Sequence, residues 1–291
     1  MLEIRLNQAS GCLAPPLRDE LERLSAAQQQ LCEEIRLRVG QPLTVTVQGR
    51  EKAVGSRKLG EKDLEDTLSR ATEYSVHTFA ESLGQGFVTV QGGHRIGVCG
   101  QAAVRDGKVL SFRSLSSLNI RVARQMLGVA ERELIDQLRE QNGVHSALFL
   151  SPPGRGKTTL LRDLARQLSD SGVRTGLADE RAELAALYRG QPQFDIGRHT
   201  DVMDGCPKAE AAMMLLKTMS PQLLVLDEIT SQDDVQAAMY AAHCGVAVLA
   251  SAHAWNMDDF RLRPLYRRLL EAQIFSRIFS IQHDRRVQLI Q

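Results

Sequence analysis

The residues best suited to chemistry form a short loop in the middle of the chain, SPPGRGKTT at 151–159. Lysine followed by threonine at the end of a glycine-containing loop is typical of a Walker A motif, whose backbone N–H groups surround a phosphate. Lys157 is expected to reach the β- and γ-phosphates of ATP, and the Thr158 hydroxyl to bind Mg²⁺. A side chain at Gly156 would hold the backbone away from the phosphate. The predicted nucleotide-binding residues are Ser151, Pro152, Pro153, Gly154, Arg155, Gly156, Lys157, Thr158 and Thr159.

This loop departs from the usual pattern at its first position, where Ser151 replaces glycine. That glycine eases the turn out of the preceding strand, and a serine followed by two prolines turns less freely. We expect nucleotide binding to survive, weakened at most. The alternative, a loop that binds no phosphate, is disfavoured by the motifs that follow.

A second motif, LLVLDE at 223–228, places two acids directly after an apolar run. It matches a Walker B motif, in which Asp227 would hold Mg²⁺ through its water shell and Glu228 would orient the attacking water. The alternative is that these acids cap the following helix.

Two more apolar runs end in polar residues. VRTGLADE ends at Asp179 and Glu180, which either point toward the phosphates or cap a helix predicted over 181–190; the sequence leaves both open. VAVLASAH ends at His253, which is placed to sense a γ-phosphate, although a lone histidine is more often structural.

These motifs need strands and helices to position them. ALFL at 147–150 reads as a buried strand before the loop, and residues 159–170 place leucines on one helical face after it. Strands and helices then alternate, which predicts an α/β fold, a RecA-like P-loop domain with a mostly parallel sheet covered on both faces. Ligands bind beyond the carboxyl ends of such strands, where the motifs would meet.

The first half of the chain predicts a smaller α+β domain. Its expected helices cover 17–30, 61–72 and 76–84, its first two strands 33–40 and 42–49, and a strand meander with turns at Gly92-Gly93 and Asp106-Gly107 begins at Gly86. We place the domains at 1–135 and 136–291.

Composition narrows the class of protein. The formal net charge is +1 and aromatic residues make up 4%, which argues against a nucleic-acid-binding domain. The five cysteines show no metal-binding spacing and are expected to be reduced and cytosolic. No stretch approaches the roughly 18 to 20 apolar residues of a membrane span, so work at a membrane would require partner proteins.

The later half resembles the RecA-like ATPases of type II and type IV secretion systems. Their Walker A, acidic, Walker B and histidine boxes occur in the order shown here by SPPGRGKT, ADERAE, LLVLDE and ASAH. Nearly the whole chain resembles the stage III sporulation AA family more closely, through EEIRLRVG, QGGHRIGVCG, SSLNIRVAR, DERAEL and TDVMDGCPKAEAAMMLL. The chain departs from that family at Ser151 and Thr230, where glycine is usual.

The resemblance implies an ATPase that assembles into a ring, expected to be a hexamer, at the mother-cell cytoplasmic face of the forespore membranes. There it would energise a secretion-like channel of integral membrane proteins. In such rings arginines of the small domain approach the nucleotide of a neighbouring subunit, and Arg95 and Arg113 are expected to do so, ahead of Arg121. A trans arginine contributes roughly 10³ to 10⁵ in rate, so an isolated subunit should hydrolyse ATP poorly.

The expected catalytic residues are therefore Glu228, Glu180, His253, Arg95 and Arg113, with Thr158 and Asp227 at the metal. Two other functions stay open at this point. One is a nucleic-acid-dependent P-loop ATPase, and the other is a scaffold that binds nucleotide without hydrolysing it.

Overall fold

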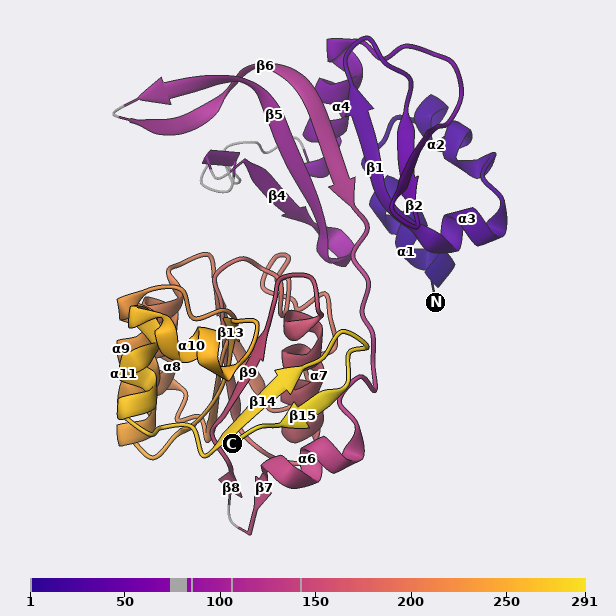
Figure 1. Cartoon of the computed structure of the whole chain (residues 1–291). Coiled ribbons are helices and arrows are strands. Elements are labelled where there is room, and N and C mark those ends of the chain that lie inside the picture. Colours follow the sequence, from indigo (N-terminus) through magenta and orange to yellow (C-terminus); the bar gives the residue numbers. More distant parts are fainter. Residues whose placement is uncertain (1, 74–82, 85, 106, 142) are drawn as a thin grey trace. The chain divides into compact units, whose positions relative to one another are not determined.

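A computed structural model describes residues 2–73, 83–84, 86–105, 107–141 and 143–291 (Figure 1). They divide into an N-terminal unit, Met1–Arg124 with Tyr188–Gln193, and a C-terminal unit, Gln125–Leu187 with Phe194–Gln291. The division predicted between residues 135 and 136 falls inside helix α6 (Arg132–Leu138), in the C-terminal unit.

The N-terminal unit contains a six-stranded sheet in the order β3-β2-β1-β6-β5-β4, and all neighbouring strands are antiparallel. The strands are β1 (Cys32–Arg38), β2 (Thr44–Val47), β3 (Arg50–Ala53), β4 (Phe87–Val90), β5 (His94–Arg105) and β6 (Lys108–Arg121). Register pairs Val90 with His94 and Arg105 with Lys108, which confirms the two predicted hairpins, although Asp106 itself lies outside the described residues.

Four helices of this unit are α1 (Leu2–Ser10), α2 (Pro15–Glu22), α3 (Ala26–Leu31) and α4 (Glu61–Ala71). The single helix predicted over 17–30 is two helices, because Ser25 and Gln28 form a capping box that starts α3. The helix predicted over 76–84 lies mostly outside the described residues.

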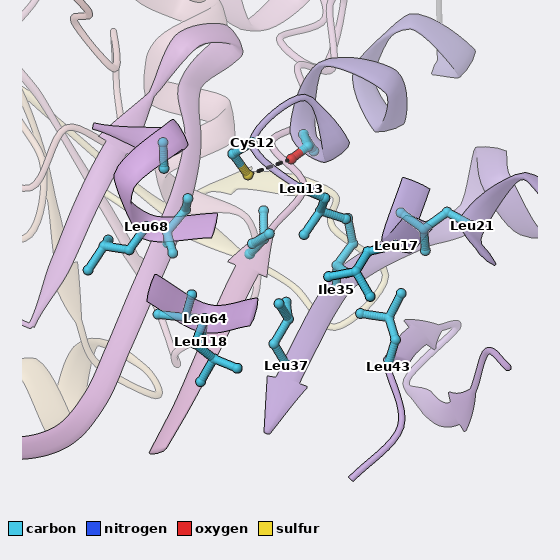
Figure 2. Packing of buried hydrophobic residues seen from close by; sticks show 14 of the residues in the cluster. Cys12, Leu13, Leu17, Leu21, Ile35, Leu37, Leu43, Leu64, Leu68 and Leu118 are labelled. Atoms are coloured by element: carbon cyan, nitrogen blue, oxygen red, sulfur yellow. Dashed lines mark hydrogen bonds between the residues drawn. The ribbon is translucent and has the colours of Figure 1, made fainter. Parts of the chain in front are cut away.

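Leucines hold the N-terminal unit together, as Figure 2 shows. Leu17 and Leu21 of α2 pack near Ile35 and Leu37, which alternate along β1 and are fully buried with Leu17. On the other side of Leu37, α4 contributes Leu64 and Leu68, next to Leu118 of β6. Burial of these side chains provides the main force that folds this unit.

The C-terminal unit contains a seven-stranded sheet in the order β11-β10-β12-β13-β9-β14-β15. Its strands are β9 (Ala147–Ser151), β10 (Thr175–Asp179), β11 (Thr200–Asp204), β12 (Leu223–Leu226), β13 (Ala247–His253), β14 (Arg277–Ile281) and β15 (Val287–Leu289). All neighbours are parallel except β14 and β15. The predicted mostly parallel sheet is confirmed. The edge strand β11 was not predicted.

Helices cover both faces of this sheet (Figure 1). Figure 1 shows α7 (Lys157–Asp170) on one side, and α8 (Lys208–Thr218), α9 (Gln232–His243), α10 (Met257–Leu262) and α11 (Pro264–Glu271) on the other. A short hairpin, β7 (Arg139–Glu140) with β8 (Gly143–Val144), follows α6. No described helix has the length and apolar character needed to cross a bilayer.

One local prediction in this unit is wrong: residues 181–190 form turns and no helix. Arg162 on α7 donates hydrogen bonds to the carbonyl oxygens of Glu183 and Leu184, at 2.5 and 2.7 Å from the respective guanidinium nitrogens. Those carbonyls are therefore already engaged with another element, and Ala182 and Ala186 have positive φ angles of 51° and 50° that interrupt a helix.

Candidate nucleotide-binding site

The P-loop connects the end of β9 to the start of α7, as the sequence predicts. Gly154 and Gly156 have φ angles of 77° and 90°, a region that disfavours residues with a side chain. A Cβ on either glycine would meet no protein atom within 4 Å, so backbone conformation rather than crowding requires glycine here. The Ser151 hydroxyl donates to the carbonyl oxygen of Pro152 at 3.0 Å, a local contact at the start of the loop.

Lys157 is the first residue of α7, and its side chain is buried against the loop. Its ammonium donates to the carbonyl oxygens of Ser151 and Pro152 at 3.1 and 3.2 Å, and lies 2.8 Å from Nδ1 of His253. Burial lowers the pKa of Lys157, while the carboxylates of Glu228 and Asp227 oppose that shift. The Lys157 amino group thus lies at the loop, within reach of a phosphate bound there.

Thr158 and Asp227 bring a hydroxyl and a carboxylate together, since Thr158 Oγ1 donates to Asp227 Oδ2 at 2.5 Å. Ser251 Oγ donates to Asp227 Oδ1 at 2.7 Å. Burial raises the pKa of Asp227, and these two hydrogen bonds oppose that shift. Hydroxyl and carboxylate oxygens are ligands that suit Mg²⁺, so the donor set fits the predicted metal.

Glu228 follows Asp227 in an unusual backbone conformation, with φ at 53°. Its N–H donates to Ser251 Oγ at 2.9 Å. Each of its carboxylate oxygens contacts a different side chain. Oε1 lies 2.9 Å from Nε2 of His253, and Oε2 lies 3.2 Å from Nη1 of Arg181. The carboxylate predicted to orient water is thereby held at both oxygens.

His253 connects the P-loop with the Walker B motif. Register pairs it with Ser151 on the neighbouring strand β9, which brings its ring between Lys157 and Glu228. Since a charged Lys157 can only donate, Nδ1 must accept, and the ring proton then lies on Nε2 and points to Glu228. The ring is a structural link inside the site and not an isolated strand-end histidine.

The two acids after β10 have different environments. Asp179 is buried, and its carboxylate accepts the backbone N–H groups of Glu183, Leu184, Ala185 and Ala186 at 2.8 to 3.3 Å. Asp179 therefore accepts hydrogen bonds from backbone amides in the way that a helix cap does. The amides belong to a turn, because no helix forms at 183–186. The Glu180 side chain is 44% exposed, and its carboxylate lies 3.9 Å from the Nζ atom of Lys208.

The candidate arginines lie in the N-terminal unit. Arg95 is on β5 and its guanidinium carbon lies 3.5 Å from the ring centroid of Phe87. Arg113 is exposed on β6, and Arg121 at the end of that strand lies 3.8 Å from Glu34. The cluster described above contains none of the three, and their proposed role in a neighbouring subunit's site stays a prediction.

Sequence reasoning missed three residues of the site: Ser251, Arg181 and Lys208. A signal existed for two of them. Ser251 alternates with His253 along β13, so both project from the same face, and Lys208 begins α8, where the helix dipole disfavours a cation. A lysine at that position needs an anionic partner from elsewhere in the fold.

Comparison with known sequences gives a family for this chain. The family model described as "Sporulation stage III, protein AA" matches residues 4–291. Stage III sporulation protein AA of Bacillus subtilis (strain 168) is 40% identical over 282 residues, which are 95% of this chain and 91% of that protein.

Solved structures agree on the fold. The ATPase DotB of Legionella pneumophila superposes with a TM-score of 0.61 at 18% identity, covering 95% of this chain and 79% of DotB. The pilus retraction motor PilT with bound ADP gives a TM-score of 0.61 at 17% identity, covering 91% of this chain and 77% of PilT. At such identities the likeness establishes a common fold.

Proposed function

The chain belongs to the family of sporulation stage III protein AA, and on that premise we propose that it binds and hydrolyses ATP as the motor of a sporulation-specific, secretion-like channel complex. The observation that carries the proposal is the cluster of Lys157, Thr158, Asp227, Glu228 and His253 at one end of the parallel sheet. The shared fold with PilT, a motor that was crystallised with ADP, supports it.

Each residue of the cluster has a role in this proposal. The backbone amides of 151–159 and the ammonium of Lys157 bind the phosphates of ATP. Thr158 and Asp227 hold Mg²⁺, which neutralises charge on the phosphates when bound. Glu228 orients the attacking water and accepts its proton, and His253 keeps that carboxylate in place. Glu180 is an additional acid at the edge of the site.

Assembly completes the site in this proposal. Subunits form a ring, proposed to be a hexamer, in which Arg95 or Arg113 of one subunit stabilises charge on the nucleotide of the next. The ring is peripheral at the mother-cell face of the forespore membranes and acts on integral membrane proteins there. Two findings support this arrangement: the chain belongs to a family of sporulation proteins, and it shares its fold with the ATPase DotB.

Nucleotide binding and turnover of two variants test the proposal. Lys157→Ala should abolish ATP binding, whereas Lys217→Ala, an exposed lysine in the last turn of α8, should bind like the wild type. Glu228→Gln should retain binding and reduce turnover by roughly 100-fold or more, because it cannot accept a proton. Glu210→Gln, an exposed acid of α8, is its matched control.

Turnover should be measured on the protein co-purified with its membrane partners as well as alone. Equal ATP affinity in Lys157→Ala and the wild type would remove the basis of the site assignment. Absence of turnover in the fully assembled complex would exclude a motor and favour a nucleotide-binding scaffold.

A further inference from the structure

Lys208 is a charged residue in an almost fully buried position, with 6% of its surface exposed. Burial of an ammonium group is unfavourable unless anions or carbonyl oxygens replace the lost water. Its place at the start of α8 adds to the cost, because the helix N-terminus carries partial positive charge. Compensating contacts must therefore come from other elements.

Three such contacts surround its Nζ atom. The backbone oxygen of Glu228 lies 2.5 Å away, the carboxylate of Asp234 on α9 lies 3.4 Å away, and the carboxylate of Glu180 after β10 lies 3.9 Å away. One ammonium thus touches the Walker B turn, the helix that follows it and the acidic box. The acidic box is far in the sequence from the Walker B turn (residues 227–231) and from α9, which follows that turn directly.

The contact with Glu228 reaches a strained part of the backbone. At φ 53° Glu228 is in a region that residues with side chains seldom occupy, so its neighbours must hold it there. Its N–H is held by Ser251, and its carbonyl oxygen by Lys208. Both backbone polar groups of the residue that orients water are fixed from outside its own turn.

The contact with Asp234 fixes the rest of the turn. One oxygen of the Asp234 carboxylate accepts the N–H groups of Thr230 and Ser231 at 2.8 and 3.0 Å, and Lys208 contacts the same oxygen. Asp234 is itself buried. Lys208 compensates its charge, so the lysine supports residues 228–231 both directly and through Asp234.

We propose that Lys208 is a positioning residue for hydrolysis: it fixes the Walker B turn in the conformation that presents the Glu228 carboxylate to the site. This inference rests on the proposed ATPase function only for its effect on turnover. The geometric part, control of the turn at 227–231, can be measured without hydrolysis.

The main test is Lys208→Met, which removes the charge and keeps nearly the same side-chain length. Its control is Lys217→Met, because Lys217 is an exposed lysine of the same helix. Hydrogen exchange followed by mass spectrometry should show the amides of 228–231 exchanging at least about tenfold faster in Lys208→Met alone. In the assembled protein its turnover should fall by roughly 100-fold while its affinity for ATP stays within about threefold of the wild type.

Two further variants separate positioning from general stability. Lys208→Met with Asp234→Asn removes both buried charges, so the protein should fold, yet the Glu228 carbonyl still lacks its donor and turnover should stay low. Lys208→Arg retains donors and charge and should recover at least about tenfold of the lost turnover.

The outcomes distinguish this inference from the proposed function. The positioning role of Lys208 would be overturned if the amides of 228–231 exchanged at the wild-type rate both in Lys208→Met and in Lys208→Met with Asp234→Asn. Wild-type turnover in that double variant would overturn it as well. Faster exchange in Lys208→Met, combined with a wild-type complex that hydrolyses no ATP, would support the positioning role and overturn the ATPase proposal alone.

Discussion

The Nζ atom of Lys157 lies 2.8 Å from Nδ1 of His253. The opposite ring nitrogen lies 2.9 Å from the carboxylate of Glu228, so one imidazole touches the P-loop lysine and the Walker B acid together. A phosphate that attracts the Lys157 ammonium acts on the same group that the His253 ring contacts. Binding at the P-loop and the orientation of Glu228 are therefore linked through a single side chain.

Removal of this link should affect turnover more than binding. His253→Ala leaves the P-loop amides and Lys157 in place but frees one oxygen of Glu228, so we expect turnover to fall by roughly 100-fold and ATP affinity to change by less than about threefold. Steady-state turnover and fluorescent-nucleotide binding measure the two effects. His243→Ala, an exposed histidine at the end of α9, should change neither. A large loss of affinity in His253→Ala would contradict this assignment.

Asp179 should matter for stability and not for the chemical step. In Asp179→Asn one oxygen becomes an NH₂ group that faces two backbone N–H donors, which should destabilise the C-terminal unit by about 2 to 3 kcal/mol. Denaturant unfolding measures the free energy, and faster proteolysis at 180–187 should accompany the loss. Asp201→Asn, an exposed acid on the neighbouring strand β11, is the matched control. Unchanged stability in Asp179→Asn would show that the loop does not depend on this carboxylate.

His94 should make the N-terminal unit sensitive to acid. The ring is fully buried, its Nδ1 accepts the N–H of Ala123 at 3.0 Å, and burial, followed by the charge of Arg5, lowers the pKa of His94 to about 4. In the unfolded chain the pKa is about 6.5, so between pH 6.5 and pH 4 the unfolded state binds the additional proton. Stability should therefore fall as the pH falls, by about 3 kcal/mol from this group at pH 4.

Urea unfolding of the whole chain between pH 4 and pH 8, with a probe in the N-terminal unit, measures this contribution. His94→Asn keeps an acceptor near Ala123 but does not titrate, so only the wild type should lose stability through this position as the pH falls. The difference in the free energy of unfolding between wild type and variant should therefore shrink toward pH 4. His243→Asn should leave the wild-type slope unchanged. A constant difference between wild type and His94→Asn across this range would refute the expectation.

Mixed assemblies test the arginines. If Arg113 acts on the nucleotide of a neighbouring subunit, Arg113→Ala and Glu228→Gln subunits should each be inactive alone but regain part of the turnover when mixed, because some interfaces then combine an intact arginine with an intact acid. The same experiment with Arg95→Ala ranks the two candidates. Arg121→Ala serves as the comparison that is expected to have the smaller effect. Failure of every mixture to recover turnover would argue against an arginine supplied in trans.

Much of the site could be predicted because its motifs are local. Four apolar residues followed by acids mark β12 and its carboxyl end, and Gly156-Lys157-Thr158 marks the start of α7. In a parallel sheet those ends lie at one edge, so Thr158 and Asp227 could be expected to meet although they are far apart in the chain. The family and the α/β fold followed from the same motifs and their order.

Other features depended on contacts that no local pattern contains. Residues 181–190 have helical spacing, yet Arg162 binds two of their carbonyl groups and Asp179 binds four of their amides, so the segment forms turns. The position of Lys208 at the start of α8 indicates that it needs an anionic partner, but only the folded chain shows that its partners are Glu228, Asp234 and Glu180.

The sequence by itself determined the family, the α/β fold with its mostly parallel sheet, and the lysine, hydroxyl and acids of the P-loop and Walker B motifs. Only the tertiary structure decided that Asp179 organises a loop, that His253 bridges Lys157 and Glu228, and that Lys208 supports the Walker B turn. The reason is physical: periodic patterns record which face of an element is buried, whereas a buried charge is stabilised by whichever partners the folded chain brings to it.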